Sequence, residues 1–387
     1  MSISISRAMW EDLGNLSSEN RFISDSEKKI ALSLAVNCLL GVSLSIFLFI
    51  IGCAEMPDIE PVAFTPEPAP KSQGALEQNN RLTEVELLAE GLLIGPEDVA
   101  LDEEGLVYTS EEDGAIRRIL HDGSVEEFVQ TGGRPLGLAF DLQGNLVACD
   151  PGLGLISVSP TGKIDTLVAL SRELPLHFPN DLDIAPDGRI YFSDVTSGIF
   201  VHDTFHDILV HRPFGRLLRY DPSVGVMDVV GENLYYANGV TVGGGGRFVL
   251  VTELGAYRVT RFWLKGERSG ERDVFADNLP GYPDGIMADG KGNFWLAIVS
   301  PRNRTVDEVY HPRVWIKKLL MRLPDWLRPG AEAYGFVLKL NHNGEIVESL
   351  HDPSGKTFSN VSNVIEKEGK LYLASLYGNA IGVYHLP

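Results

Sequence analysis

Cysteine is scarce in this chain: Cys38, Cys53 and Cys149 are the only three among 387 residues. The first two lie in or beside an apolar run near the N-terminus, so the remainder of the chain cannot form an internal disulfide. Cys149 is best interpreted as a small buried hydrophobic residue. A disulfide-stapled scaffold is therefore excluded, and the length is enough for a large hydrophobic core.

Positively charged residues are also few compared with negatively charged ones. The chain has 33 Lys and Arg against 53 Asp and Glu, which gives a formal net charge of -20. A surface this acidic repels phosphate backbones, so nucleic acid is excluded as a partner. The same charge suits cations, although it does not specify one.

One long hydrophobic run is present near the N-terminus. Residues 30–52 are uncharged and, at 23 residues, are long enough to cross a bilayer as a helix. Lys28 and Lys29 precede the run and several acidic residues follow it, which predicts that residues 1–29 are a cytoplasmic tail. The rest of the chain would then lie on the non-cytoplasmic side, in the periplasm, a lumen or the extracellular space.

Two interpretations of this run stay open. It is either an uncleaved transmembrane anchor or the h-region of a lipoprotein signal, in which residues 1–29 are the n-region and Ile50-Ile51-Gly52-Cys53 resembles a lipobox. Both interpretations tether the globular part to a membrane. Residues 53–81 are rich in Pro, Glu and Ala and are expected to be an extended linker. The mass of the mature N-terminus distinguishes the two, because a chain that begins at a lipidated Cys53 is not an anchor.

A glycine-centred hairpin pattern repeats six times in residues 82–387. The copies are EDVALDEEGLVYTS, LGLAFDLQGNLVAC, NDLDIAPDGRIYFS, NGVTVGGGGRFVLV, DGIMADGKGNFWLA and VSNVIEKEGKLYLA, with turn glycines at Gly105, Gly144, Gly188, Gly246, Gly292 and Gly369. Short apolar strands flank each turn, and further strands follow in most copies. Repeats of about 40–50 residues with several strands each indicate propeller blades. The sequence thus predicts an all-β fold, a six-bladed β-propeller.

The last copy ends after its third strand, at Pro387. Residues 83–89 (TEVELLA) would supply the missing outer strand and close the ring, which removes exposed sheet edges.

Four oxygen-bearing side chains share one register of this repeat. The residues eight positions before the turn glycines are Glu97, Leu136, Asn180, Asn238, Asp284 and Val361. In a radial repeat, equal register means equal position around the central channel. Two carboxylates and two amides would then converge at its mouth, with Leu136 and Val361 as an apolar wall.

This ligand set predicts a calcium site. Ca²⁺ accepts six to eight oxygen ligands, so four protein oxygens leave room for water or substrate. No histidine or cysteine occupies the register, which argues against zinc. A second, structural ion is left open.

Such a cation can polarise an ester or lactone carbonyl and stabilise an oxyanion. Asp284 is then a candidate base or nucleophile, and His177, three residues before Asn180, is a candidate for acid–base work. A structural role for His177 on the rim is an equal alternative.

Two insertions follow second strands, at residues 198–212 and 301–333, and therefore emerge on the same face as the four oxygens. In the second insertion, apolar residues are predicted to share one face of a helix and basic residues to lie largely opposite. The apolar set is Trp315, Ile316, Leu319, Leu320 and Leu323, and the basic set is Arg313, Lys317, Lys318 and Arg322. This helix is interpreted as rim packing, a substrate lid or a membrane-contact element.

Several motifs resemble the strictosidine synthase-like family over nearly all of residues 82–387. They are HFPNDLDIAPDGRIYFSD, GRLLRYDP, YYANGVTV and LPGYPDGIMADGKGNFWLA. The family is similar to a wider group of calcium-dependent six-bladed propellers that includes gluconolactonases, regucalcin and paraoxonases, and it includes a membrane-anchored arylesterase. The resemblance implies that Glu97, Asn180, Asn238 and Asp284 are the metal ligands.

Two positions depart from the expected pattern. The resemblance places the catalytic glutamate of strictosidine synthases at Ser362 and the paraoxonase dyad histidine near Leu136. We therefore expect a membrane-tethered, calcium-dependent hydrolase of a lactone, aryl ester or related carboxylic ester, with Ser362, Leu136 and Val361 near the substrate. The alternatives are a non-catalytic propeller that binds a ligand or partner and, less favoured, a condensing enzyme.

Overall fold

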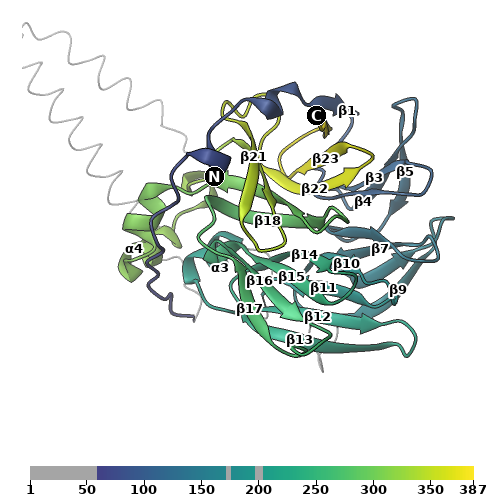
Figure 1. Ribbon diagram of the computed structural model, residues 1–387, viewed down its shortest axis with the longest axis horizontal. Helices are drawn as coiled ribbons and strands as arrows, with labels where there is room; N and C mark the ends of the chain where they lie inside the picture. The colour runs from purple at the N-terminus through teal and green to yellow at the C-terminus, as the bar shows by residue number, and fades with distance from the viewer. Residues whose placement is uncertain (1–58, 171–175, 197–203) are drawn as a thin grey trace, which may run out of the picture. The chain divides into compact units, whose positions relative to one another are not determined.

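Six four-stranded antiparallel sheets surround a central channel in the computed structural model, which describes residues 59–170, 176–196 and 204–387 (Figure 1). This confirms the predicted six-bladed propeller. Blade one contains β2 (Val99–Leu101), β3 (Val107–Ser110), β4 (Ala115–Ile119) and β5 (Val125–Gln130). Blade two contains β6 (Leu138–Phe140), β7 (Leu146–Asp150), β8 (Gly154–Val158) and β9 (Ile164–Ala169). Blade three contains β10 (Pro179–Ile184), β11 (Ile190–Asp194), β12 (Gly215–Asp221) and β13 (Val226–Leu234).

The other three blades follow the same order. Blade four contains β14 (Ala237–Gly243), β15 (Phe248–Glu253), β16 (Arg258–Trp263) and β17 (Arg272–Ala276). Blade five contains β18 (Gly281–Ala288), β19 (Phe294–Pro301), β20 (Gly335–Leu340) and β21 (Ile346–Asp352). Blade six contains β22 (Val361–Lys367), β23 (Lys370–Ser375), β24 (Ile381–His385) and β1 (Glu86–Leu88). The first strand of each blade contacts the first strands of its two neighbours, so these six strands line the centre.

Ring closure occurs as predicted. β1 pairs with β24 through the residue pairs Glu86↔Val383, Leu87↔Gly382 and Leu88↔Ile381. The C-terminus consequently lies beside β1 (Figure 1). Because the first described strand completes the last blade, blade six has four strands like the other five and β24 is covered on its outer side.

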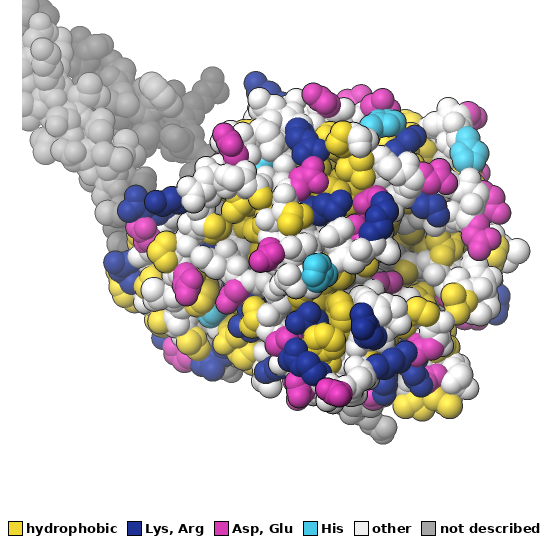
Figure 2. Space-filling view, in the orientation of Figure 1, with side chains coloured by type: hydrophobic (Ala, Val, Ile, Leu, Met, Phe, Trp, Pro, Cys, Tyr) yellow, Lys and Arg dark blue, Asp and Glu magenta, His cyan; other side chains and the backbone are white. Residues whose placement is uncertain are grey.

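The six repeat glycines all adopt left-handed backbone conformations, with φ from 76° at Gly369 to 98° at Gly292. Side chains with a Cβ rarely adopt this conformation, which explains why glycine recurs in each first hairpin. Between blades, apolar side chains such as Leu250, Leu296 and Leu338 are fully buried in shared clusters. On the face drawn in Figure 2, acidic and basic side chains are interspersed, so the net negative charge is not gathered there into one patch.

Short helices occupy the two insertions. They are α3 (Thr204–Val210), the π-helical turn η4 (Val306–Tyr310), α4 (Val314–Leu320) and η5 (Asp325–Leu327). Three further 3-10 turns lie elsewhere: η1 (Gly74–Leu76), η2 (Arg81–Glu84) and η3 (Leu254–Ala256). Leu209 and Val210 of α3 pack against Leu320 of α4, so the two insertions form one joint cover.

The predicted faces of the helix in the second insertion are confirmed in part: Leu320 packs inward as predicted, but three other residues do not follow the pattern. Lys317 is fully buried, whereas Trp315 and Leu319 are 66% and 43% exposed. The Lys317 ammonium donates a hydrogen bond to the Val62 carbonyl oxygen at 2.7 Å, which satisfies its buried charge. That partner lies 255 residues away in the sequence, so the helical pattern alone could not reveal it.

Residues 59–68, named here the N-terminal strap, run across both insertions. The strap donates backbone hydrogen bonds from Val62 to Val210 and from Phe64 to His311, each 3.0 Å long. The Phe64 ring stacks on His211 with a centroid distance of 4.0 Å. The predicted linker at residues 53–81 is therefore, from residue 59 onward, extended chain that is anchored on the propeller.

The predicted membrane segment, residues 30–52, lies outside the described residues. Among the residues that the structure describes, no helix is both long and apolar enough to cross a membrane.

Candidate active site

Three of the four predicted ligands sit in β-bulges at the starts of first strands. The strand register shifts between Pro179 and Leu182, between Ala237 and Val240, and between Pro283 and Ile286. Each bulge contains one predicted ligand, Asn180, Asn238 or Asp284. A bulge inserts an extra residue and re-aims a side chain, which here turns each ligand toward the channel. Glu97 lies just before β2 and is held by its backbone N–H, which donates to the Ser110 carbonyl at 3.1 Å.

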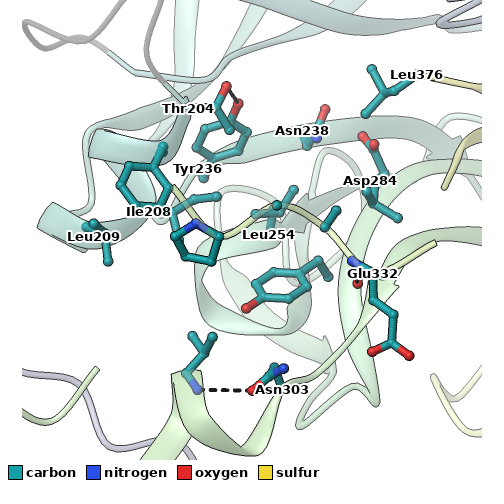
Figure 3. A pocket seen from close by; sticks show the side chains of 18 of the residues that line it. Thr204, Ile208, Leu209, Tyr236, Asn238, Leu254, Asp284, Asn303, Glu332 and Leu376 are labelled. Atoms are coloured by element: carbon teal, nitrogen blue, oxygen red, sulfur yellow. Dashed lines mark hydrogen bonds between the residues drawn. The ribbon is translucent and has the colours of Figure 1, made fainter. Parts of the chain in front are cut away.

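All four predicted ligands line one cavity of about 850 Å³. They are buried, with exposed fractions of 8% for Glu97 and Asn180, 4% for Asn238 and 3% for Asp284. In Figure 3, Asn238 and Asp284 extend from neighbouring strands into the same end of the cavity, while Leu209 lies at the other end. The convergence that the repeat register predicts is thus present in the folded chain.

Two oxygens in this group have no hydrogen-bond partner. Glu97 Oε2 and Asn238 Oδ1 are both buried and unpartnered. Leaving a buried polar atom unpaired costs about 1–3 kcal/mol, so folded proteins rarely keep two at one site without use for them. Unpartnered acceptor oxygens are the expected state of cation ligands.

The backbone behind these ligands is fixed by hydrogen bonds between blades. The Ser362 hydroxyl donates to the Glu97 carbonyl at 2.6 Å, and the Thr252 hydroxyl donates to the Asp284 carbonyl at 2.8 Å. The Gly137 N–H donates to the Asn180 carbonyl at 2.7 Å. These bonds fix the backbone of the ligand residues and leave their side-chain oxygens free for the cavity.

Two further carboxylates lie one residue deeper in the same register. Asp98 accepts from the Leu138 N–H at 2.6 Å, and Asp181 accepts from the Val240 N–H at 2.7 Å, so each joins its own blade to a neighbour. Both are buried, with exposed fractions of 2% and 6%. They add negative charge directly beneath the ligands.

The buried carboxylates hold protons more tightly than exposed ones. Burial, partly offset by the charge of Arg134, raises the pKa of Glu97 to about 7. Burial is also the main cause that raises the pKa of Asp181 to about 8 and that of Asp284 well above its usual range, and the charge of Glu97 adds to the rise at Asp284. Several acids that resist ionising together form a site whose charge a cation would neutralise.

Apolar and aromatic side chains form most of the cavity wall. The propeller contributes Leu136, Phe178, Tyr236, Leu254, Tyr282 and Val299, and the insertions contribute Ile208, Leu209, Tyr310 and Leu320. The cavity therefore has one polar end and one broad apolar side, as expected for a small-molecule site. Both insertions cover it, which agrees with the lid interpretation of the second insertion.

The other predicted site residues are placed differently. Leu136 lines the cavity, but Val361, Ser362 and His177 are not among its lining residues. Val361 is fully buried, and Ser362 directs its hydroxyl at the Glu97 carbonyl. His177 donates its backbone N–H to Asp194, and its buried Nδ1 has no partner.

Several lining residues escaped the sequence analysis, chief among them Arg134 and His311. Arg134 stands only two positions before the register residue Leu136, so a wider window around the register would have found it. His311 belongs to the second insertion, which no repeat pattern describes. Burial and then the charge of Lys317 lower the pKa of His311 to about 3, which keeps the ring neutral near pH 7.

The donor set fits a hard cation. Within the described residues, no group of three or more His, Cys, Asp and Glu side chains is placed to hold a metal ion. The candidate set instead mixes two carboxylates with two amides, and all four donors are oxygens, which suits Ca²⁺ and not zinc.

Comparison with known proteins assigns the family. Residues 180–267 match the strictosidine synthase family and residues 74–119 match the strictosidine synthase-like N-terminal family. Adipocyte plasma membrane-associated protein of Salmo salar is 34% identical over 362 residues, which cover 87% of this chain and 85% of that protein. The chain belongs to the strictosidine synthase-like family.

Other members of the strictosidine synthase-like family are similar at the same level. The human adipocyte plasma membrane-associated protein is 32% identical over 363 residues, which cover 87% of this chain and 86% of that protein. Protein STRICTOSIDINE SYNTHASE-LIKE 3 of Arabidopsis thaliana is 36% identical over 265 residues, which cover 66% of this chain and 67% of that protein.

Solved structures agree on the fold. A gluconolactonase from Xanthomonas campestris superposes with a TM-score of 0.58 at 19% identity, covering 86% of this chain and 99% of that one. A calcium-binding protein, regucalcin, from Agrobacterium tumefaciens superposes with a TM-score of 0.56 at 14% identity, covering 78% and 92%. At these identities the likeness shows the propeller alone.

Proposed function

We propose that this protein is a membrane-tethered, Ca²⁺-dependent hydrolase of a lactone, aryl ester or related carboxylic ester. The observation that carries the proposal is the pair of buried, unpartnered oxygens, Glu97 Oε2 and Asn238 Oδ1, at the polar end of a large apolar cavity. The gluconolactonase and the calcium-binding regucalcin share the propeller fold with this chain, and the proposal extends the lactonase reaction and the calcium to it from the site residues.

Glu97, Asn180, Asn238 and Asp284 would hold the cation. Ca²⁺ bound there would act as a Lewis acid toward a carbonyl oxygen. The protein's own part is to keep the four oxygens in place through the bulges and the hydrogen bonds from Ser362 and Thr252 behind them. The apolar wall would hold the substrate's hydrocarbon part and limit the access of bulk water.

Asp284 is the proposed base. Burial and the charge of Glu97 raise the pKa of Asp284, so a bound cation would be needed to favour the ionised carboxylate that can accept a proton from water. His177 does not line the cavity, so the proposal gives it no step. Asp284 must serve both as ligand and as proton acceptor, as some carboxylates in metal sites do.

The membrane tether is part of the proposal. It rests on the uncharged residues 30–52 and on relatives that are named adipocyte plasma membrane-associated protein. The tether would hold the propeller on the non-cytoplasmic side of the membrane, with either an uncleaved anchor or a lipidated Cys53.

A panel of lactones and aryl esters, assayed with purified full-length protein with and without EDTA, tests the hydrolase. We expect hydrolysis that EDTA abolishes, that added Ca²⁺ restores and that Asp284→Ala removes. Activity that survives both EDTA and Asp284→Ala would exclude this function.

A non-catalytic, ligand-binding propeller is the second candidate. It is favoured by one observation: no histidine lies within the four-residue ligand set, and the predicted helper His177 lies outside the cavity lining. Calcium-dependent ligand binding without turnover of any ester in the panel would support this alternative. A condensing enzyme is disfavoured, because Ser362 is buried and bonded to the backbone where that chemistry would need a glutamate.

A further inference from the structure

Arg134 is the only Lys or Arg among the described residues that line the cavity. Its Nη1 is buried and has no hydrogen-bond partner within residues 59–170, 176–196 and 204–387. Other arginines that lie beside buried acids are paired: Arg117 with Glu111 at 2.7 Å, and Arg258 with Glu253 at 2.7 Å. An unpaired guanidinium inside a chain with a net charge of -20 therefore calls for a ligand of its own.

The loop that carries Arg134 is rigidly held. The fully buried Asp150 accepts hydrogen bonds from the Arg134 N–H at 3.0 Å, from the Gly152 N–H at 2.8 Å and from the Thr131 hydroxyl at 3.1 Å. A Cβ at Gly133 would lie 2.3 Å from the Asp150 carboxylate, so only glycine fits there. The guanidinium is thus presented to the cavity from a fixed backbone, which lowers the entropy cost of ligand binding.

Glu97 is not an ion-pair partner of Arg134. The two side chains both line the cavity, yet no ion pair or hydrogen bond joins them, and Glu97 Oε2 remains unpartnered. Glu112 and Glu332 also line the cavity, but no carboxylate of the described residues forms an ion pair with Arg134. The donors of this guanidinium are therefore left for an acceptor that the ligand brings.

We propose that Arg134 forms an anion subsite and that the substrate is an ester or lactone carrying a carboxylate or phosphate group apart from its reacting carbonyl. The planar guanidinium binds either group through paired N–H donors. The apolar wall then takes the hydrocarbon between the two polar ends, so the substrate is an anionic amphiphile. That the anionic compound is hydrolysed rests on the proposed hydrolase function. That an anion binds at Arg134 does not depend on it.

Binding of a non-reacting anion tests the subsite without catalysis. Calorimetry on the full-length protein with Ca²⁺ would compare hexanoate and hexyl phosphate with neutral hexanamide. We expect the wild-type protein to bind the anions at least about 10-fold more tightly than the amide, as for a charge-assisted hydrogen bond. The ratio of the dissociation constants for hexanoate and hexyl phosphate identifies which anion is preferred. Equal binding of anion and amide overturns the proposal without any variant.

Variants then assign the effect to Arg134. Arg134→Gln should weaken hexanoate binding roughly 10- to 100-fold, and Arg134→Lys should keep part of it, because Lys retains the charge but loses the paired donors. Arg247→Gln, which changes an arginine in the β14–β15 turn, is the matched control and should leave binding unchanged. Unaltered hexanoate binding in a folded Arg134→Gln protein contradicts the subsite.

A pair of esters separates the subsite from the hydrolase. We expect Arg134→Gln to raise KM for 4-acetoxybenzoate and to leave phenyl acetate within about twofold. An equal fall in kcat for both esters would mean that Arg134 acts through the proposed cation ligands Glu97 and Asp284 and not on the substrate's anionic group. That result would overturn the subsite. If the wild-type protein hydrolyses neither ester yet prefers hexanoate to hexanamide, the hydrolase fails and the anion subsite stands.

Discussion

Asn238 has a buried side-chain oxygen that no donor in the described chain satisfies. Its replacement therefore tests whether this oxygen binds a cation. We expect Asn238→Ala to abolish the Ca²⁺-induced rise in melting temperature and the calorimetric binding signal, because one of four protein ligands is lost. The metal-free protein should melt nearly as the wild type does, since the deleted oxygen has no partner to leave behind.

Asn341→Ala is the matched control, because Asn341 lies in the β20–β21 turn and its side chain bonds only to Asn343 and Glu345 of the same turn. That variant should bind Ca²⁺ normally. Full Ca²⁺ binding by Asn238→Ala would remove this residue from the site.

Ser362 has a different role from the one its family position implies. Its hydroxyl donates to the Glu97 carbonyl from a nearly fully buried position. We expect Ser362→Ala to lower the free energy of unfolding by about 1–2 kcal/mol, because a buried carbonyl loses its donor. Urea unfolding measures this loss.

Ser124→Ala is the control for Ser362, since that hydroxyl is exposed and bonds only to Asp122 in the same turn. A change within about 0.5 kcal/mol is expected there. Equal stability of the two variants would show that the bond from Ser362 to Glu97 contributes nothing.

Among the secondary elements, the N-terminal strap links α3 to α4 through hydrogen bonds of its backbone. Phe64 contacts His211 by stacking and His311 edge-on, with centroid distances of 4.0 and 5.4 Å. Phe64→Ala should lower the free energy of unfolding by about 2 kcal/mol, less than for a fully buried ring, because Phe64 is half-buried.

Val62→Ala serves as the control, because the Val62 side chain is 40% exposed while its backbone bonds are kept. Chemical denaturation of the full-length variants gives both values. A loss at Val62 as large as that at Phe64 would mean that the strap is held by its backbone alone.

The histidines beneath the strap predict a pH dependence of stability. The pKa values of His211 and His311 are both lowered to about 3, mainly by burial and secondly by the charge of Lys317. The unfolded chain binds protons near pH 6.5, so each histidine destabilises the fold as pH falls from about 6.5 toward 3, by up to about 1.4 kcal/mol per pH unit.

His211→Gln should therefore flatten the fall in stability between pH 6.5 and 4 compared with the wild-type protein. The comparison isolates the histidine, because the buried carboxylates with raised pKa act in the opposite direction in both proteins. Parallel pH profiles for variant and wild type would contradict the buried neutral ring. Unfolding at several pH values supplies the profiles.

For the molecule as a whole, the proposed tether would determine on which side of a membrane the propeller lies. The full chain should stay in the membrane pellet after extraction with alkaline carbonate, because residues 30–52 are apolar enough to be held by the bilayer. Removal of residues 1–52 should release the protein. Metabolic labelling with palmitate, lost in Cys53→Ala, would indicate the lipoprotein form, whereas an unlabelled, uncleaved chain indicates the anchor. Extraction of the full chain by carbonate would contradict both forms.

Sequence periodicity alone predicted the number of blades, the closing strand and the shared register of the four proposed metal ligands. Each of these depends on local periodicity: a left-handed turn needs glycine, strands alternate, and equal positions in a radial repeat meet at one axis. Glu97, Asn180, Asn238 and Asp284 were found for that reason. The same periodicity could not describe the insertions, which have no counterpart in the other blades.

Which side chains of the insertions face inward, and which residues complete the cavity, depends on contacts that exist only in the folded chain. Lys317 is buried, although the helical pattern places it outside, because its ammonium donates to a carbonyl of the strap that is remote in the sequence. Arg134 is a candidate ligand-binding residue because its buried Nη1 has no partner among the described residues. A sequence does not show which charged groups stay unpaired after folding. Long-range hydrogen bonds and desolvation act between segments that only the fold brings together, and they determine both the cover of the cavity and its charge.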